Sequence, residues 1–362
     1  MLAHLNTSGF ASLLYPTVNR EGRETAVAVV RGTFELNDDG RLIPVEEQPG
    51  VRLEDRFYGD QGVSTALEES DLAVYKPGTD VVVVGAAHAP NERAVTSIHV
   101  GVRVGDLQKS ALVTGDREYE RVLGVGPVVP SEPKPFTTMP LVWERSFGGV
   151  DPRTVDSERP QFEARNPIGC GYVSGKLLRA PISGQKLPNI SPLRRSAGMH
   201  SEPCGFSPIG RAWLPRYSLA GTYDERWKRD RSPFLPADFD YAFFQCAPAD
   251  LRSPQHLRGD EPVRIVNMSP EGELAFNLPG LVMGLTIRVD GKSPLRCLAA
   301  LDTVILEPAR RRVSLVWRRA IACRRSTNEV LRVGSFALTR WGAATVLGSE
   351  VDAPIGEPKW RS

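Results

Sequence analysis

The sequence predicts a mainly β protein, with antiparallel sheets in a sandwich-like arrangement, a long irregular central insert and one or two short helices. The first observation behind this prediction is the alternation of apolar and polar residues. In HVGVRV (99–104), the three valines face one way, while His99, Gly101 and Arg103 face the other. The second observation is a tract from about residue 150 to residue 260 that is rich in proline and glycine and has few regular runs.

The expected strands follow one another as hairpins. TAVAVVRGTFEL (25–36) is apolar on both sides at its start, which is typical of a strand covered on both faces. NDDG (37–40) supplies a turn with Gly40 available for positive φ, and RLIPVE (41–46) returns as the second strand. LTIRVDG (285–291) alternates as a half-buried strand. Further hairpins are predicted around Gly105-Asp106, around Glu271-Gly272 and over 301–317.

Helical signal is confined to the irregular tract. TYDERWKRDR (222–231) and PADFDYAFFQ (236–245) are the two candidates, and Asp238 or Asp240 could cap the second one. The chain is therefore divided into an N-terminal β region, an irregular middle, a C-terminal β region and an extension, with one continuous domain expected over 10–320. The regions cover 1–150, 151–260, 261–322 and 323–362.

Composition argues against several classes of partner. Lys plus Arg number 45 and Asp plus Glu 43, so the formal charge is only +2, and no nucleic-acid or membrane partner is expected. The five cysteines are odd in number and lack any C-x-x-C pair, which is typical of reduced thiols. The first twenty residues show no secretory signal pattern, and no apolar run is long enough for a membrane helix. A cytoplasmic location is expected.

RNPIGCGYVSGK (165–176) invites a phosphate-loop interpretation, which its spacing rejects. A Walker loop would need glycine where Cys170 stands and a hydroxyl residue where Leu177 stands. The dinucleotide pattern fails as well, because its three glycines leave one residue too many. We therefore interpret these glycines as backbone turns: Gly169, Gly171 and Gly175.

Metal and catalytic signatures are equally weak. His200 and Cys204 are four residues apart, but no second pair completes a zinc site. No G-x-S-x-G nucleophile motif is present. We assign no catalytic residue, no cofactor-binding residue, no cofactor and no metal ligand.

Carboxylates near tryptophans leave a carbohydrate-active enzyme or glycan-binding protein open as an alternative. Trp143 with Glu144, and Glu307 ahead of Trp317, could supply acid/base groups and sugar-stacking rings, as could Trp227 beside two carboxylates. The pattern favours a structural interpretation, in which Glu144-Arg145 and Asp302 with Arg318 are ion-pair partners that tie strands together. We expect Asp302 and Arg318 to pair across the 301–318 hairpin.

Six ordered blocks resemble the bacterial family of domain of unknown function 2169 (DUF2169), over about residues 10–320. The blocks cover 32–49, 69–90, 135–149, 165–172, 220–252 and 301–318. Within them, the residues that we interpret as a structural family motif are Trp143, Glu144, Arg145, Asn166, Pro167, Gly169, Gly171, Asp302, Glu307, Trp317 and Arg318.

The resemblance implies a non-enzymatic adaptor or chaperone of type VI secretion. Such a protein would bind an effector toxin and help to load it onto a spike protein of the VgrG/PAAR type. A structural component of the secretion apparatus is a further alternative. Arg, Trp and Tyr anchor many protein interfaces, so we expect the partner-facing region in the middle segment, around Trp213, Tyr217, Tyr223 and Trp227.

Overall fold

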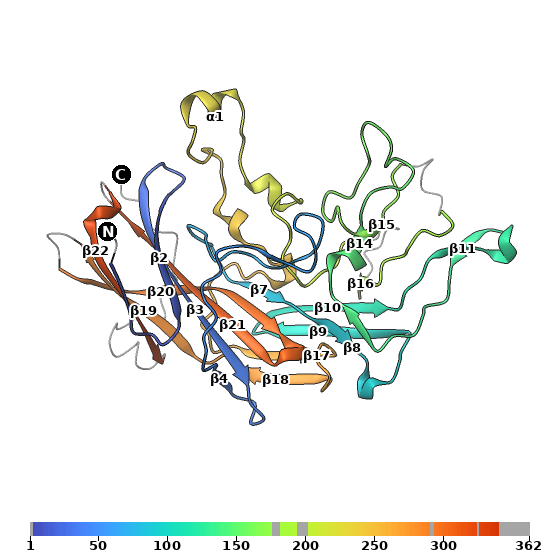
Figure 1. Cartoon of the computed structure of the whole chain (residues 1–362), viewed down its shortest axis with the longest axis horizontal. Helices are drawn as coiled ribbons and strands as arrows, with labels where there is room; N and C mark the ends of the chain where they lie inside the picture. Colours follow the sequence, from blue (N-terminus) through green and yellow to red (C-terminus); the bar gives the residue numbers. More distant parts are fainter. Residues whose placement is uncertain (1–2, 176–181, 194–201, 290–292, 324–325, 340–362) are drawn as a thin grey trace.

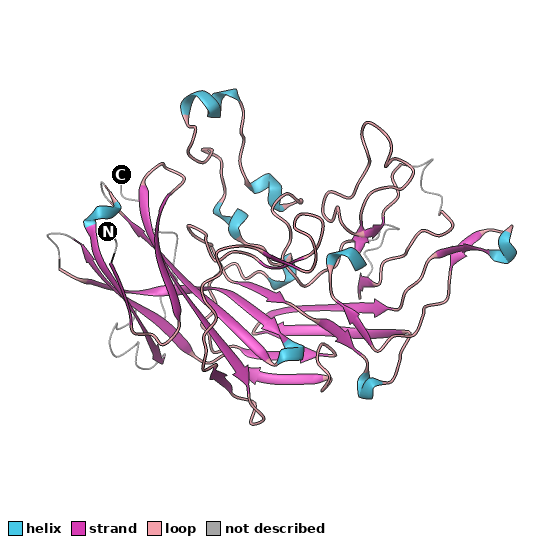
Figure 2. Cartoon of the chain, viewed as in Figure 1, coloured by secondary structure: helices cyan, strands magenta, loops and turns pink. Residues whose placement is uncertain are grey.

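The computed structural model describes residues 3–175, 182–193, 202–289, 293–323 and 326–339. Two large β-sheets form the body, while loops and short helices rise from one side of it (Figures 1 and 2). The predicted mainly β class is confirmed. The strands longer than four residues all lie outside 151–260, and within that tract the described chain is mostly irregular, as expected.

The larger sheet has nine strands and is mixed. Its main path runs β1-β22-β19-β20-β21-β3-β2, with β4 on β3 and β7 on β20. Two of its pairings are parallel, β1 with β22 and β7 with β20, so this sheet is mixed where antiparallel sheets were expected. The terminal strands β1 and β2 also contact each other, so that the sheet nearly closes on itself. The strands are β1 (Ala3–Asn6), β2 (Ala11–Val18), β3 (Glu24–Leu36), β4 (Leu42–Pro44), β7 (Asp80–Val83), β19 (Leu281–Val289), β20 (Leu295–Glu307), β21 (Arg312–Ala322) and β22 (Val330–Thr339).

The second sheet has five antiparallel strands in the order β16-β10-β9-β17-β18. The valines predicted to share one face of β9 are buried, whereas His99 and Arg103 on the other face are exposed. Gly105 has φ +56°, a left-handed conformation that suits the tight β9–β10 turn. The strands are β9 (Ser97–Val104), β10 (Leu107–Thr114), β16 (Ile190–Pro192), β17 (Pro262–Val266) and β18 (Glu273–Asn277).

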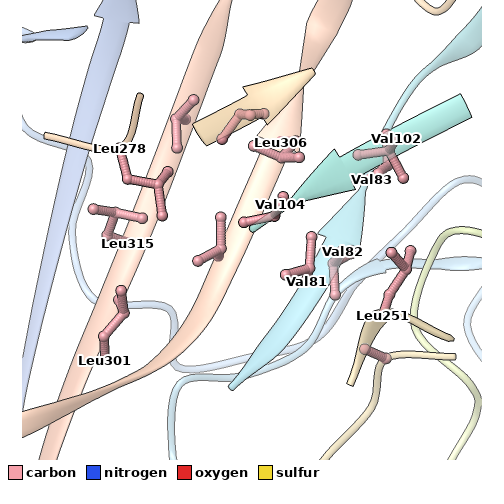
Figure 3. Close-up of a cluster of buried hydrophobic side chains, with 14 of the residues drawn as sticks. Val81, Val82, Val83, Val102, Val104, Leu251, Leu278, Leu301, Leu306 and Leu315 are labelled. Atoms are coloured by element: carbon pink, nitrogen blue, oxygen red, sulfur yellow. The ribbon is translucent and has the colours of Figure 1, made fainter. Parts of the chain in front are cut away.

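One continuous apolar core joins the two sheets. Val102 and Val104 of the five-stranded sheet belong to the same buried cluster as Leu306 and Leu315 of the nine-stranded sheet (Figure 3). Burial of apolar side chains between two sheets is the usual origin of sandwich stability, at roughly 25 cal/mol per Å² of apolar surface. Both sheets combine strands from the first 150 residues with strands beyond residue 261.

Strand β3 is buried on both faces, as its sequence predicted. Ala28 and Val30 face the main core, while Val27 and Val29 belong to a second cluster with Val316 and Ala320 of β21. This second face of the sheet is covered by the largely irregular chain that follows β4, between residues 45 and 79, rather than by the five-stranded sheet.

Both helical predictions are confirmed in a shorter form. Helix α1 (Glu225–Asp230) begins after Asp224, whose carboxylate accepts from Trp227 N. The second candidate forms only a 3₁₀ turn, η5 (Tyr241–Phe244), which Asp240 caps; Asp238 instead accepts from Thr222. The other 3₁₀ turns are η1 (Pro90–Glu92), η2 (Val122–Gly124), η3 (Trp143–Arg145), η4 (Arg216–Leu219), η6 (Ala249–Leu251), η7 (Pro308–Arg310) and η8 (Thr327–Glu329).

Small two-stranded units complete the described chain. They pair β5 (Arg56–Phe57) with β6 (Ala66–Glu68), β8 (Ala86–His88) with β13 (Thr138–Pro140), β11 (Tyr119–Arg121) with β12 (Val128–Pro130) and β14 (Phe147–Gly148) with β15 (Cys170–Gly171). Of the predicted extension, residues 330–339 form strand β22, while 340–362 lie outside the described residues.

Candidate partner-binding surface

A run of charged side chains, Glu68 to Asp80, fastens the chain segment that covers β3 and β21. Arg31 of β3 donates to Glu68 at 2.5 Å and to Asp71 at 3.2 Å, with all three side chains buried. Arg318 of β21 lies 2.6 Å from Asp302 and also donates to the carbonyl oxygen of Ala73. The predicted pairing of Asp302 with Arg318 across the hairpin is therefore confirmed.

Two carboxylates of this layer, those of Asp302 and Glu68, have pKa values below their ordinary ones. Burial alone would raise the pKa of Asp302, but the charges of Arg318 and Lys76 outweigh it and hold that pKa below its ordinary value. Burial also opposes ionisation of Glu68, and Arg31 and Arg52 likewise lower its pKa. A buried ion pair that loses one partner leaves an uncompensated charge, which costs about 3–5 kcal/mol.

Lys76 and Asp80 continue the same layer toward the middle segment. Lys76 Nζ lies 2.9 Å from Asp80 Oδ2 and donates to the Thr303 hydroxyl. The Asp80 carboxylate also accepts from the backbone N–H groups of Cys246 and Ala247. The irregular middle is thus attached to the sheet by hydrogen bonds to a buried charge.

Arg216 is the first residue of the 3₁₀ turn η4, and its side chain holds this turn in place from the buried side. Its guanidinium is buried and forms a two-pronged pair with Glu69, including 2.8 Å between Nη2 and Oε2. It also donates to the carbonyl oxygens of Ile209 and Phe243, both at 2.7 Å. A planar guanidinium that donates to a carboxylate and to two carbonyl oxygens at once fixes the backbone segments that carry these acceptors.

Trp143 supports the neighbouring loop. Its ring packs edge-on against Trp213 at 5.8 Å between centroids, and its indole N–H donates to Pro208 O at 2.9 Å. A Cβ at Gly205 would lie 2.6 Å from this ring, so only glycine fits there. Trp213 is buried by this packing and does not reach the surface, where the sequence had placed it among the partner-facing residues.

Glu144 and Arg145 do not pair with each other, contrary to the sequence-based interpretation. Both follow Trp143 in the 3₁₀ turn η3 and not in a strand. The Glu144 carboxylate accepts from the backbone N–H of Thr65 at 2.8 Å and from its hydroxyl, while Arg145 lies 2.8 Å from Asp116. Each side chain therefore joins η3 to a different loop.

Around Asn166 and the neighbouring glycines, backbone segments approach one another closely. We call this close-packed region the Asn166 knot. The Asn166 side chain donates to Trp143 O at 2.9 Å and to Phe147 O at 3.0 Å. Gly149 has φ +85°, and a Cβ there would lie 2.2 Å from Gly169 O. Gly171 also has positive φ, as the interpretation of these glycines as backbone turns predicted; Pro167 occupies the adjoining turn. Lys176 and Leu177 lie outside the described residues.

Four exposed apolar residues, which we call the Tyr217 surface, lie on segments that backbone contacts link to one another and to these supports. Tyr217 is 62% exposed, and its backbone N–H donates to Trp213 O at 2.8 Å. The backbone N–H of Leu214 donates to Ala164 O at 2.9 Å, which places η4 beside the segment that carries Phe162. Phe162 in turn pairs with Val150 through a β-bridge. The surface consists of the exposed residues Val150, Phe162, Leu214 and Tyr217.

The other two expected aromatics lie on an arm formed by residues 221–236, which rises from the body with α1 at its tip (Figure 1). Tyr223 and Trp227 contact each other edge-on at 4.7 Å, and the Trp227 indole N–H donates to Phe234 O. Phe234 packs against Gly22 of the β2–β3 turn, so that the arm rests on the sheet. Thus the structure separates Tyr217 from the pair formed by Tyr223 and Trp227.

A recess of about 340 Å³ lies at the base of the arm. The Arg20 guanidinium lies over the Tyr241 ring at 5.4 Å, and Tyr75 meets Tyr241 edge-on. The acidic groups at its rim already accept hydrogen bonds, Asp238 from Thr222 and Asp240 from Ala242. This volume lies at the lower end of the range for small-ligand pockets, and it is large enough to receive a side chain of a partner.

The residues considered for sugar chemistry have structural contacts. Trp317 is 1% exposed and stacks on Phe10 in the core, and Trp143 is also buried, so neither ring is presented to a sugar. Glu307 lies 3.2 Å from Arg310. No group of three or more His, Cys, Asp or Glu side chains with the geometry of a metal site occurs in the described part of the chain, and His200 lies outside it.

Sequence reasoning missed most of the Tyr217 surface. Phe162 and Leu214 lie in stretches without periodicity, and only the hydrogen bond between their segments brings them together. Among the described residues, no helix is both long and apolar enough to span a bilayer.

A comparison with protein families agrees with the resemblance seen in the sequence. A family model described as "Uncharacterized protein conserved in bacteria (DUF2169)" matches residues 21–318. Neither the comparison with curated proteins nor that with solved structures gave a match. The matched range includes the charged layer, the Asn166 knot, the Tyr217 surface and the arm.

Proposed function

Since the chain belongs to the DUF2169 family of bacterial proteins, we propose that it is a non-enzymatic adaptor or chaperone that binds a type VI secretion effector toxin. In this proposal it acts in the cytoplasm and helps to transfer the toxin to a spike protein. The type VI context comes from the family resemblance, and the choice of a binding role rests on the features described above.

The observation that carries the proposal is the Tyr217 surface with its support. Tyr217 is exposed while the adjacent Arg216 is buried and bound to Glu69, Ile209 and Phe243. Exposed aromatic side chains on an immobilised backbone lose little conformational entropy on binding, which favours protein recognition. The arm, with Tyr223 and Trp227, and the recess at its base extend this region.

Co-expression with effector toxins encoded in the same locus tests the proposal. We expect a stable complex on size-exclusion chromatography and a higher soluble yield of the toxin. Absence of a complex with the toxin and with any other protein of the same locus would contradict the proposal.

Other outcomes would select the alternatives. Co-purification with baseplate or sheath proteins in a strain that lacks the toxin would favour a structural component of the apparatus. Glycan turnover that is lost in a folded Glu144→Gln or Glu307→Gln variant would favour a carbohydrate-active enzyme.

A further inference from the structure

Three arginines share the outer face of the nine-stranded sheet where β22, β19 and β20 lie side by side (Figure 1). Arg332 of β22 lies directly opposite Arg288 of β19. Arg296 of β20 lies opposite Thr286, which shares a face with Arg288 because alternate residues of a strand point the same way. Ile287, between them, faces the core, so the three arginines point away from it, and all are exposed. We call Arg288, Arg296 and Arg332 the arginine face.

The arginine face has no counter-charge within the described part of the chain, where none of its three guanidinium groups forms an ion pair. Arg319 of the next strand, β21, donates to Leu298 O, two residues along β20 from Arg296, and adds a positive charge. Glu24 of β3 is engaged by Thr327, whose backbone N–H and hydroxyl both donate to it. The connections outside the described residues, 290–292 and 324–325, contain one acidic and three basic residues. The sign of this region is therefore positive.

The five-stranded sheet shows how such a pair of like charges is relieved elsewhere in the molecule. Arg103 of β9 also lies directly opposite an arginine, Arg264 of β17. There, however, Arg264 lies 2.7 Å from Glu273, and Arg103 Nε donates to Gly105 O at 2.9 Å. Like charges directly opposite each other on neighbouring strands are destabilising. An uncompensated pair at the arginine face is explained by a ligand that supplies the negative charge.

The surroundings of the arginine face favour a protein as the source of that charge. Leu5 of β1, which lies opposite Gly334 two residues along β22 from Arg332, shares this face and is 46% exposed. Arginine beside exposed apolar side chains is typical of protein interfaces. Nucleic-acid sites make roughly 6–10 phosphate contacts, and basic clusters that bind anionic lipid have roughly 4–8 Lys or Arg. The three arginines of this face fall below both ranges and suit a short acidic segment of a protein.

We propose that the arginine face binds an extended acidic segment of a partner protein, with Asp or Glu at alternate positions. Such carboxylates are about 7 Å apart along the segment, close to the spacing of about 7–8 Å expected for the diagonal pair of Arg288 and Arg296. Each guanidinium can donate two parallel hydrogen bonds to a carboxylate. This inference goes beyond the proposed function, because it concerns the outer face of β19, β20 and β22 and does not depend on the Tyr217 surface.

Fluorescence anisotropy with the full chain tests the inference. The probe is a labelled peptide in which glutamate alternates with serine, and the control peptide has glutamine in place of each glutamate. We expect saturable binding of the glutamate peptide that weakens as the salt concentration rises, and binding of the glutamine peptide that is at least about fivefold weaker. Equal binding of the two peptides would overturn the inference.

Two double variants locate the binding site on the molecule. Arg288→Gln combined with Arg332→Gln should lower the affinity for the glutamate peptide at least about fivefold. Arg103→Gln combined with Arg264→Gln removes the same charge from the other opposed pair and should leave the affinity unchanged. An equal loss in both variants would show an effect of net charge alone and would overturn the inference.

Two further measurements separate a binding role from a structural one and a protein ligand from a phosphate ligand. The Arg288→Gln and Arg332→Gln variant should keep or raise the melting temperature, because an opposed pair of like charges is removed; a lower melting temperature would show a structural role instead. Single-stranded DNA and vesicles of phosphatidylcholine with phosphatidylglycerol should bind no more tightly than the peptide. Tighter binding of either that is lost in this variant would overturn the choice of a protein. All these measurements are made without a toxin, so their failure would leave the proposed function unaffected.

Discussion

The Nε atom of Arg318 lies 2.6 Å from Oδ2 of Asp302, and both side chains are buried between the sheet and the chain that covers it. Arg318 also donates to Ala73 O in the covering segment, so the pair joins two strands and a loop. The pair therefore fixes a cross-strand register and the position of the covering layer together.

Removal of one partner should destabilise the fold strongly. Asp302→Ala leaves the Arg318 charge buried, and we expect a loss of about 3–5 kcal/mol in the free energy of unfolding, measured by urea denaturation. The matched control is Glu273→Ala, which breaks the exposed Arg264–Glu273 pair of 2.7 Å and should cost less than about 1 kcal/mol. Equal effects of the two substitutions would contradict a special role for burial.

Acid should lower the free energy of unfolding, because it protonates carboxylates of the same charged layer. The folded-state pKa values of Asp302 and Glu68 are lower than their ordinary values. Their stabilising contribution is therefore complete above the ordinary carboxyl pKa of about 4 and is lost as the pH falls below it. Urea midpoints between neutral pH and pH 3 should decline less steeply in Glu68→Gln than in the parent chain; parallel declines would show that Glu68 does not take part.

The Asn166 knot should tolerate no side chain at Gly149. A Cβ there would meet Gly169 O at 2.2 Å, in addition to the cost of a positive φ. Gly62 has a similar φ of +82° with nothing within 4 Å of its added Cβ. Gly62→Ala should therefore cost about 1 kcal/mol, and Gly149→Ala several kcal/mol more, by thermal unfolding. Equal costs would mean that crowding is relieved by a small backbone shift.

Truncation at the Tyr217 surface should weaken the toxin complex without affecting folding. For Tyr217→Ala we expect a rise of about tenfold or more in the dissociation constant, measured by calorimetry, as for aromatic anchors in other interfaces. Ile43→Ala, at a half-exposed position on the edge strand β4, should leave binding unchanged. If both variants bind as the parent chain does, the toxin contacts another surface.

Local sequence patterns were sufficient to predict the strands, but not to predict which strands pair with each other. Alternation in 99–104 and the two-sided apolar run in 25–36 identified β9 and β3, and the short loop over 301–318 brought Asp302 to Arg318. The parallel pairing of β7 with β20 joins residues more than 200 positions apart, and no local signal encodes it. The candidate site was predicted only in part for the same reason: Tyr217 was visible as an aromatic, but Phe162 reaches its neighbourhood through a long-range backbone contact.

The interleaving of early and late strands has a consequence for synthesis. One edge of β3 pairs with β2 and β4 soon after it emerges, but its full-length partner on the other edge is β21, which begins at Arg312. During most of translation the nascent chain thus presents a long unpaired edge, rich in valine, to other polypeptides in its surroundings. Nascent chains that stop short of β21 should aggregate or be bound by ribosome-associated chaperones, and folding should be slow because the pairing of β3 with β21 joins residues more than 270 positions apart.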